Sequence, residues 1–581
     1  MTAQQPKSGD AEDTTLEFPH ANIVAVRALA GALASTLGPR SCDKLVVAEQ
    51  ADDSDVAPGT RMAGDVVVAS DAATILERLP IQHPIAPVLR RMVGPERPGD
   101  TGVEGEDMPD GTATRAVLAG GLLDRAESLL ERGLHPRSVI EGYERAHGIA
   151  RDELRDMRIT FEEFSDPQKA RVGTARTAMT GNVAGGHRDA WARIVVEAVD
   201  LVGMPDEETF DVERTHDGTI DETRLVRGAV LGRSERADRK MPRRVENASV
   251  LVLDGHDRGG LQERDAPDDA TVELDTPADV ADYEVIRRNR KETIVERFVD
   301  VGVDVVVTRL GIDTDYQTLL ADAGIVGIRG VSPLNLSRIV RATGAQPIPD
   351  PTDVAEDHLG RAGHVAEIAV EPYPGRRKKR RMTVFEECLD PAGVTVLLRG
   401  VSNQVADQAA TAIRKGAFAV GMATTTDQRP GGVVPGGGTA HVRVADAVRD
   451  AATGVGSRNQ FAMEAYADAA ERVVATLARN GGLDPITAVP DIRAAQEAGT
   501  AATGIVMPGG TVGNCLDAGV LDPLAVLLDA YLYATDVATL VLGIDDTVDA
   551  VRIEDPVADD DVIYDEPAEL QKRTLEERDG Q

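Results

Sequence analysis

Residues 303–331 read VDVVVTRLGIDTDYQTLLADAGIVGIRGV, and this stretch decides the class of the fold. A short apolar, β-branched run stands at each end, and a segment with helical spacing lies between them at 314–322. Another strand-like run, ASVLVLDG, precedes this stretch at 248–255, and helical spacing occupies the region near 278–301. Strands that alternate with helices in this way are typical of an α/β domain. The centre of the chain is therefore predicted to be α/β.

The parts of the chain on either side of this centre are predicted to be mostly helical. Apolar residues recur at helical spacing in NIVAVRALAGALASTL (22–37), and two long helices are expected at about 112–132 and 136–157. Near the other end, residues 459–482 form an amphipathic helical pattern that ends at paired glycines. A chain of 581 residues has room for roughly three or four domains. The pattern predicts a multidomain α/β (α+β) protein in which an insertion interrupts one domain.

The charge balance is strongly acidic, with 98 acidic and 63 basic residues and a net charge of −35. Only nine of the basic residues are lysines, and 54 are arginines. This balance argues against a nucleic-acid partner, because phosphate neutralisation needs a basic surface. An acid-rich, lysine-poor chain is typical of a halophilic protein whose charges are screened by salt. The alternative is an acidic mesophilic protein encoded by a GC-rich genome.

Cysteines, histidines and apolar segments exclude several other classes of protein. The three cysteines form no CxxC pair, and the ten histidines include no HExxH, so neither a disulfide framework nor a transition-metal site is expected. The polar, acidic N-terminus does not resemble a signal peptide. The most apolar C-terminal stretch, 520–544, is interrupted by Asp522, Asp529 and Asp536, so it is not expected to span a bilayer. The sequence thus predicts a soluble, cytoplasmic protein without a membrane partner.

A run of six basic residues at 376–381 (RRKKRR) could indicate a nuclear signal or a nucleic-acid patch. It follows Pro374-Gly375, however, and lies between two strand-like pieces. A solvated hairpin arm that offsets nearby acids is the favoured interpretation.

The strongest chemical signal is the pentapeptide Asp110-Gly111-Thr112-Ala113-Thr114, which begins a long predicted helix. A helix N-terminus presents free N–H groups that suit a phosphate, and Gly111 lets the backbone approach closely. The hydroxyls of Thr112 and Thr114 can add hydrogen bonds, and Asp110 can hold a Mg²⁺ that bridges phosphate oxygens. An ordinary helix cap is the alternative for this pentapeptide taken alone.

Four further motifs occur along the chain with this pentapeptide: TLGP at 36–39, DAATIL at 71–76, VPGGG at 434–438 and GVLDP at 519–523. Together the five resemble, in the same order, the nucleotide-site motifs of the chaperonins. The pieces MPRRVENASVLVLD (241–254) and VTVLLRG (394–400) are similar to the group II, thermosome-type branch. The resemblance covers about residues 20 to 550.

The resemblance implies a chaperonin fold with a mostly helical equatorial domain, a small intermediate domain and an α/β apical domain with a helical lid. The implied boundaries are 1–146 (equatorial, first part), 147–212 (intermediate, first part), 213–370 (apical), 371–401 (intermediate, second part), 402–555 (equatorial, second part) and 556–581 (acidic tail).

The same resemblance implies a site for ATP and Mg²⁺. Its expected residues are Leu37, Gly38 and Pro39 lining the nucleotide, Asp110 with Gly111, Thr112 and Thr114 at the metal and phosphates, and Gly437 and Asp522 at the ribose. Asp71 is expected to help organise the metal and the attacking water, as the catalytic carboxylate that remains in this chain.

One departure from the family pattern concerns catalysis. The family places a His-Asp pair on the helix after VTVLLRG, and its carboxylate orients the hydrolytic water; Arg414 and Lys415 align there. A lysine with an ordinary pKa of about 10.4 is cationic and cannot act as a base at neutral pH. Asp407, eight residues upstream, lies about 12 Å away along a helix and is too far to replace it.

Three further departures surround the same site. Gly185 stands where a phosphate-sensing lysine is expected, Pro109 replaces the glycine before the Asp-Gly pair, and Ala72 replaces the glycine after Asp71. The sequence therefore predicts an ATP-binding chaperone subunit of a thermosome-type double ring, with hydrolysis weakened in this chain. Its expected partners are non-native proteins and identical or different chaperonin subunits. The alternative is a structural or regulatory subunit, or a holdase, without significant ATPase activity.

Overall fold

The computed structural model describes residues 17–38, 40–47, 66–79, 83, 85, 111–179, 185–232, 236–255, 260–262, 276–370, 380–400, 403–425, 431–507 and 509–544. One compact unit extends from His20 to Gly543 and contains the elements described below, apart from the first turn of α1. Of the remaining residues, 1–19 and 544–581, only 17–19 and 544 are described.

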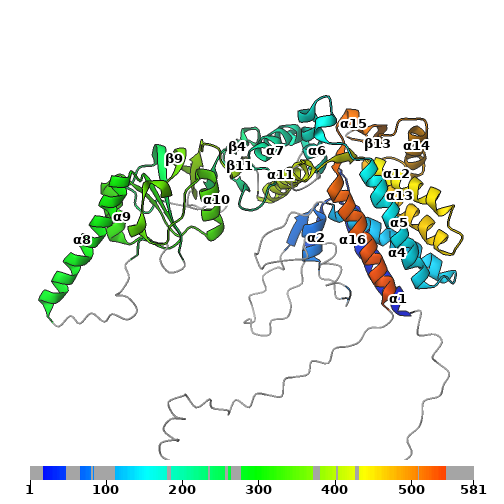
Figure 1. Cartoon of the computed structure of the whole chain (residues 1–581), viewed down its shortest axis with the longest axis horizontal. Helices are drawn as coiled ribbons and strands as arrows, with labels where there is room; N and C mark the ends of the chain where they lie inside the picture. Colours follow the sequence, from blue (N-terminus) through cyan, green and yellow to red (C-terminus); the bar gives the residue numbers. More distant parts are fainter. Residues whose placement is uncertain are drawn as a thin grey trace, which may run out of the picture. The chain divides into compact units, whose positions relative to one another are not determined.

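Helices from both ends of the chain pack together in one group. Cyan α4 and α5 lie beside orange α16 in Figure 1, and α13 packs against α4, α5 and α12. The fully buried rings of Tyr143, Tyr466 and Tyr531 fill the space between these helices. The helices of this group are α1 (Glu17–Ala34), α2 (Ala72–Arg78), α4 (Thr112–Glu131), α5 (Pro136–Asp156), α12 (Thr439–Ala452), α13 (Asn459–Gly481), α14 (Pro485–Glu497), α15 (Cys515–Ala518) and α16 (Leu524–Gly543).

Local sequence signals set the ends of the long helices. The His135 side chain accepts a hydrogen bond from the Arg137 N–H at the start of α5, and Pro136 occupies the first helical position, where no N–H is needed. Gly482 ends α13 in a left-handed conformation. The predicted helices at 112–132, 136–157 and 459–482 are therefore confirmed to within one residue at each end.

Three short antiparallel pairs accompany the helices. They are β1 (Lys44–Val47) with β2 (Val66–Ala69), β12 (Val433–Pro435) with β15 (Leu521–Pro523), and β13 (Thr503–Val506) with β14 (Thr511–Asn514). The β12–β15 pair joins two motifs that are almost ninety residues apart in the sequence, and it is central to the candidate site below.

The centre of the chain forms a six-stranded sheet in the order β5-β10-β9-β6-β7-β8. The strands β6 (Arg244–Leu253), β7 (Val305–Thr308) and β8 (Val326–Ile328) are parallel, and β5 (Ala229–Leu231), β9 (Gly360–Val370) and β10 (Arg380–Glu386) are antiparallel to their neighbours. The helices α8 (Pro277–Val301), α9 (Thr314–Asp322) and α10 (Pro333–Thr343) accompany it, with two buried apolar clusters. The predicted α/β centre is confirmed.

A smaller sheet in the order β3-β11-β4 forms a third group of elements. The strands are β3 (Phe210–Arg214), β4 (Arg224–Val226) and β11 (Val394–Leu398), and the helices are α6 (Pro167–Ala178), α7 (Arg188–Val202) and α11 (Asn403–Ala423). Trp191, the protein's single tryptophan, is 1% exposed in the core that these elements share. Short 3₁₀ turns complete the fold: η1 (Phe161–Glu163), η2 (Gly185–His187), η3 (Ile220–Glu222), η4 (Pro351–Asp353) and η5 (Glu356–His358).

The basic run at 376–381 is described only at its last two residues, both in β10. β10 pairs antiparallel with β9, as expected for the two sides of a hairpin. Arg381 contributes more than charge at the surface, because its guanidinium lies 2.5 Å from a carboxylate oxygen of Glu367. Glu367 and its second partner, Arg236, are both almost fully buried. The sequence did not indicate this buried cluster.

α16 is the one helix among the described residues that is long and apolar enough to cross a membrane. It nevertheless contacts α4 and α5, and 56% of its most apolar window is buried inside the protein. The core helix of a globular protein can have the same length and apolar composition, so α16 is only weak evidence for a membrane span.

His441 gives the helical group a specific pH dependence. Burial lowers the pKa of His441 to about 4, and its Nδ1 lies 2.8 Å from the Tyr531 hydroxyl. The unfolded chain takes up this proton below about pH 6.5, whereas the folded chain does not until about pH 4, so this residue makes stability fall as the pH falls through that window. We expect this contribution to be about 2 kcal/mol between pH 7 and pH 5.

The measurement is the shift in thermal midpoint between pH 7 and pH 5, compared with His441→Gln. The variant should show a smaller shift, whatever its stability at pH 7. Tyr466→Phe is the control, because it removes a buried hydroxyl that lies 2.9 Å from that of Thr535 in the same core and removes no group that titrates between pH 5 and pH 7, so the shift should be unchanged. Equal shifts in the wild type and His441→Gln would contradict the assignment.

Candidate functional site

Strand pairing brings the glycine run at 436–438 next to Asp522. Val434 of β12 pairs with Asp522 of β15, and the Gly436 N–H donates to the Val520 carbonyl at 2.9 Å. A Cβ on Gly436 would lie 3.0 Å from Oδ2 of Asp522. Two motifs that the sequence placed at the ribose are therefore neighbours.

Gly437 is held where only a glycine fits. Its φ is +63°, and a Cβ there would lie 2.4 Å from the Ile505 carbonyl oxygen of β13. The Ile505 N–H donates to the Gly437 carbonyl at 2.8 Å. Gly437 is therefore fixed against β13, next to the strand pair that carries Asp522.

The start of α4 has features that suit an anion. Gly111 precedes it with a φ of +84°, and a Cβ there would lie 2.9 Å from Val526 of α16, which begins directly after β15. Among the residues that the structure describes, no side chain caps this helix end. Thr112 is 2% exposed, and its hydroxyl has no hydrogen-bond partner among the residues that the structure describes. A buried hydroxyl without a partner is costly, so this one fits a group supplied by a ligand. Thr114, two residues later in the first turn of α4, is half-buried.

The turn after α1 is attached to the end of α13. The Asn480 side chain donates to the carbonyls of Ala34 and Leu37 at 2.9 and 2.8 Å. Gly38 lies so close to α13 that a Cβ would be 2.5 Å from Cδ1 of Leu477. Asn480 thereby holds the turn that carries Leu37 and Gly38, two of the expected site residues. Pro39 lies outside the described residues.

Asp71 and Lys415 form an ion pair that joins two parts of the chain. Asp71 caps the N-terminus of α2, where Oδ2 accepts hydrogen bonds from the Thr74 N–H at 2.9 Å and the Thr74 hydroxyl at 2.8 Å. The other oxygen, Oδ1, accepts a hydrogen bond from Nζ of Lys415 on α11. The two side chains are 15% and 13% exposed. Both carboxylate oxygens of Asp71 are therefore engaged by groups of the protein itself.

The surroundings keep Asp71 ionised. Burial alone would raise the pKa of Asp71, but the Lys415 ammonium and the two bonds from Thr74 outweigh burial, so the pKa lies below its usual value. The pair therefore consists of a carboxylate and an ammonium at neutral pH, and α2 and α11 are held together by opposite charges.

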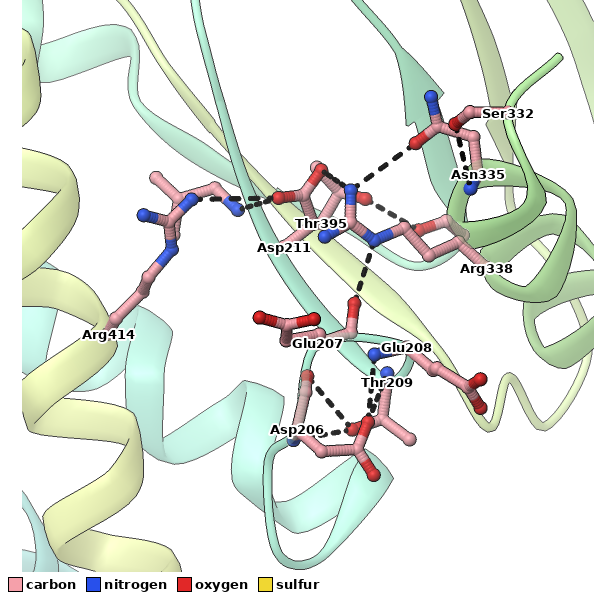
Figure 2. A network of polar contacts seen from close by, with 12 residues as sticks. Asp206, Glu207, Glu208, Thr209, Asp211, Ser332, Asn335, Arg338, Thr395 and Arg414 are labelled. Atoms are coloured by element: carbon pink, nitrogen blue, oxygen red, sulfur yellow. Dashed lines mark hydrogen bonds and ion pairs between the residues drawn. The ribbon is translucent and has the colours of Figure 1, made fainter. Parts of the chain in front are cut away.

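Arg414, the residue before Lys415, bonds in a different direction. Its guanidinium lies 3.8 Å from Oδ1 of Asp211 on β3, and the Arg338 guanidinium of α10 approaches Oδ2 at 2.8 Å. Figure 2 shows Arg338 also reaching the main chain at Glu207, where its Nε donates to the carbonyl oxygen at 2.8 Å. The Asp211 side chain is 8% exposed. Two consecutive cations of α11 thus bind two carboxylates on separate elements.

The other departures in the sequence have simple placements. The Asp407 carboxylate on α11 pairs with Arg214 at the end of β3 and not with any site residue named above. Ala72 is the buried first residue of α2, directly after its Asp71 cap. Gly185 begins the 3₁₀ turn η2. Asp110 and Pro109 lie outside the described residues.

The elements that carry the expected residues adjoin one another. α2 contacts α4, and α11 contacts both β15 and α16. Within the described residues, no three His, Cys, Asp or Glu side chains gather as a metal site would require. Sequence reasoning missed the Lys415–Asp71 ion pair and the role of Asn480. Only the opposite charges of the pair could have signalled it, across 344 positions.

Comparisons with known proteins show the family of this chain. The model of the TCP-1/cpn60 chaperonin family matches residues 29–552. A thermosome subunit of Methanopyrus kandleri is 35% identical over 91% of this chain and 91% of its own length. Thermosome subunit beta of Archaeoglobus fulgidus is 34% identical over 92% of each chain, and thermosome subunit 1 of Haloferax volcanii is 34% identical over 91% of this chain and 88% of its own. This chain therefore belongs to the TCP-1/cpn60 chaperonin family, with the multidomain chaperonin fold, and is a group II chaperonin.

Proposed function

We propose that the protein is an ATP-binding subunit of a thermosome-type double ring that binds non-native proteins and helps them fold, and that it hydrolyses ATP slowly. The observation that supports the second part is the ion pair between Lys415 and Asp71. The sequence pattern aligns Lys415 with the family's catalytic carboxylate. The family membership supports the first part. The ring contains identical or related subunits in the cytoplasm, and the net charge of −35 suits a halophilic cell.

The three groups of elements support the division into domains that the sequence predicted. In this proposal residues 1–146 and 402–555 form the equatorial domain, 147–212 and 371–401 the intermediate domain, and 213–370 the apical domain. The six-stranded sheet belongs mainly to the apical domain and the β3-β11-β4 sheet mainly to the intermediate domain.

We place the nucleotide beside four of the five motifs, those at residues 36–39, 110–114, 434–438 and 519–523. The start of α4, with Gly111 and the hydroxyls of Thr112 and Thr114, would face its phosphates. Gly437 and Asp522 would face the ribose, and the turn at 37–39 would line the site. The partnerless hydroxyl of Thr112 is the feature of this structure that fits such a ligand.

Asp71, one of the two expected Mg²⁺ ligands, fits that role poorly. Mg²⁺ needs hard oxygen ligands at near-octahedral positions, and it would neutralise phosphate charge when bound. Both oxygens of Asp71 are already engaged, one of them by a cation. In the proposal Asp110 therefore holds the Mg²⁺ that accompanies ATP, and Asp71 faces the reacting end of the nucleotide as an ion pair with Lys415.

The alternative function is a structural or regulatory subunit, or a holdase, that retains nucleotide without significant turnover. If the Lys415–Asp71 pair abolishes hydrolysis, this alternative holds; if the pair only slows hydrolysis, the first function holds. Steady-state turnover by the assembled protein separates the two functions.

Nucleotide binding is tested by Thr112→Val on the assembled protein in molar KCl. Loss of a hydroxyl that bonds a charged phosphate costs about 1.5–3 kcal/mol, so ATP affinity should fall roughly 10- to 100-fold by calorimetry. Thermal stability should not fall, because the hydroxyl has no partner among the described residues.

Thr174→Val is the matched control. Thr174 is fully buried like Thr112, but its hydroxyl donates to the Ala170 carbonyl at 3.0 Å. This variant should lose stability and keep its affinity for ATP. If Thr112→Val binds ATP as tightly as the wild type, the phosphates do not lie at the start of α4.

A further inference from the structure

The Lys415–Asp71 pair changes what the site requires of a metal ion. This inference rests on the proposed function, because it assumes that a nucleotide binds there. The two ligand-capable oxygens of Asp71 have different partners. Oδ2 caps α2 through Thr74, and Oδ1 carries the Lys415 ammonium. A metal ion at Oδ1 would have to displace the ammonium, and one at Oδ2 would have to break the helix cap. Neither oxygen is a ready ligand for Mg²⁺.

Charge opposes a metal ion at this carboxylate as well. A divalent cation beside Asp71 would lie within a few ångströms of the ammonium, and like charges repel at that distance. The side chains of the pair are only 15% and 13% exposed, so solvent and salt screen this repulsion less than they would at the surface. Asp71 is therefore neutralised by the chain itself.

The ammonium is also held in a fixed place. Lys415 lies on α11 between Ile413 and Ala417, whose side chains are 1% and 0% exposed in the core shared with α6 and α7. The helix therefore cannot shift without disrupting that core, and the ion pair fixes the end of the long side chain. A cation positioned before a ligand arrives loses little entropy when the ligand binds.

We propose that the Lys415 ammonium acts as a built-in cation of the nucleotide site, which replaces at Asp71 the positive charge that a bound metal supplies. The substrate class is a nucleoside triphosphate, whose phosphates carry the charge that must be neutralised. The subunit therefore holds nucleotide with little dependence on Mg²⁺, and any metal that accompanies the nucleotide is carried through Asp110.

The test measures the affinity for AMP-PNP, a non-hydrolysable analogue of ATP, by calorimetry in molar KCl with either MgCl₂ or EDTA. For the wild type the two dissociation constants should agree within about threefold. For Lys415→Asp and Lys415→Met the affinity in EDTA should be at least about tenfold weaker than in MgCl₂, because Asp71 then repels phosphates that no cation screens. Lys169→Met, at an exposed position of α6, is the matched lysine control and should behave as the wild type.

The possible outcomes separate the inference from the proposed function. A wild type that requires Mg²⁺ as strongly as Lys415→Asp overturns the built-in cation, although the protein is still a nucleotide binder. A wild type that binds AMP-PNP in neither buffer overturns the nucleotide site itself and the inference with it. Emission from buried Trp191 shows whether each variant is folded, so a loss of binding through unfolding is recognised.

Discussion

Lys415→Asp should raise the steady-state ATP turnover of the assembled protein by up to about 10²–10⁴-fold, which is the usual contribution of a positioned general base. The wild type should fall short of a complete group II chaperonin by a similar factor. The measurement is phosphate release in molar KCl at saturating ATP and MgCl₂. Saturation matters because the prediction concerns the chemical step and not the affinity for nucleotide.

The structure gives this prediction a second physical reason. An ammonium carries no lone pair to accept the proton of the attacking water. It also occupies the Oδ1 of Asp71, the other carboxylate expected to face that water. Lys415 therefore has two effects. It stands in place of one carboxylate that could accept the proton, and it engages Oδ1 of the second carboxylate, Asp71. An ammonium near the phosphates attracts the ground state and the transition state alike, and equal binding of the two does not accelerate the reaction.

Lys415→Met distinguishes a missing carboxylate from an inhibitory cation. If only the carboxylate matters, Lys415→Met stays as slow as the wild type while Lys415→Asp recovers. We expect full recovery to require Gly185→Lys as well, because residues that act as a unit do not contribute additively. A wild-type rate equal to that of ordinary chaperonins would show that another acid serves as the base, and the slow-hydrolysis proposal would then be abandoned.

Local patterns predicted the secondary structure well because they report on local physics. The helical stripe of 459–482 ends at glycines that adopt the left-handed cap, and α13 is found at Asn459–Gly481. The apolar runs around 303–331 become β7 and β8, with α9 between them. The order of the six strands was not predictable, because β5 and β10 join the sheet from segments about 150 residues apart through pairing that no local pattern encodes.

The candidate site was predictable at positions where the backbone conformation or a close contact permits only glycine. Gly111 and Gly437 have positive φ and contacts that exclude a side chain, so their residue type records their role. Lys415 was predictable as a departure from the family pattern, but its partner was not. A lysine on a helix gives no indication of which of 98 acidic residues it will face. The same applies to Asp211, which drew no attention in the sequence.

Arg414 and Lys415 together explain how α11 is held. The neighbouring cations bind Asp211 on β3 and Asp71 at the start of α2, while the apolar face of α11 packs in the Trp191 core. Arg338 adds a contact from α10 to the same Asp211 (Figure 2). The carboxylate of Asp211 thus lies between two guanidinium groups from different elements, and its removal leaves two cations facing each other.

Asp211→Ala should therefore destabilise the β3-β11-β4 group by about 3–5 kcal/mol, the usual cost of removing one partner from a buried ion pair. Unfolding in urea is followed by the fluorescence of Trp191, which lies in the same core as the β3 residues Phe210 and Val212. A single local reporter is needed because a chain with several domains does not unfold in one step.

The matched control is Asp407→Ala, which removes the carboxylate that pairs with Arg214 on the same small sheet. Asp407 is 65% exposed, against 8% for Asp211, so this variant should cost no more than about 1 kcal/mol. Salt provides an independent check, since molar KCl should weaken the exposed pair and leave most of the cost of Asp211→Ala in place. Equal costs for the two variants would mean that burial does not decide the strength of these pairs. Asp211 would then contribute no more than a surface acid does, and its ion pairs with Arg338 and Arg414 would not hold α10 and α11 in place.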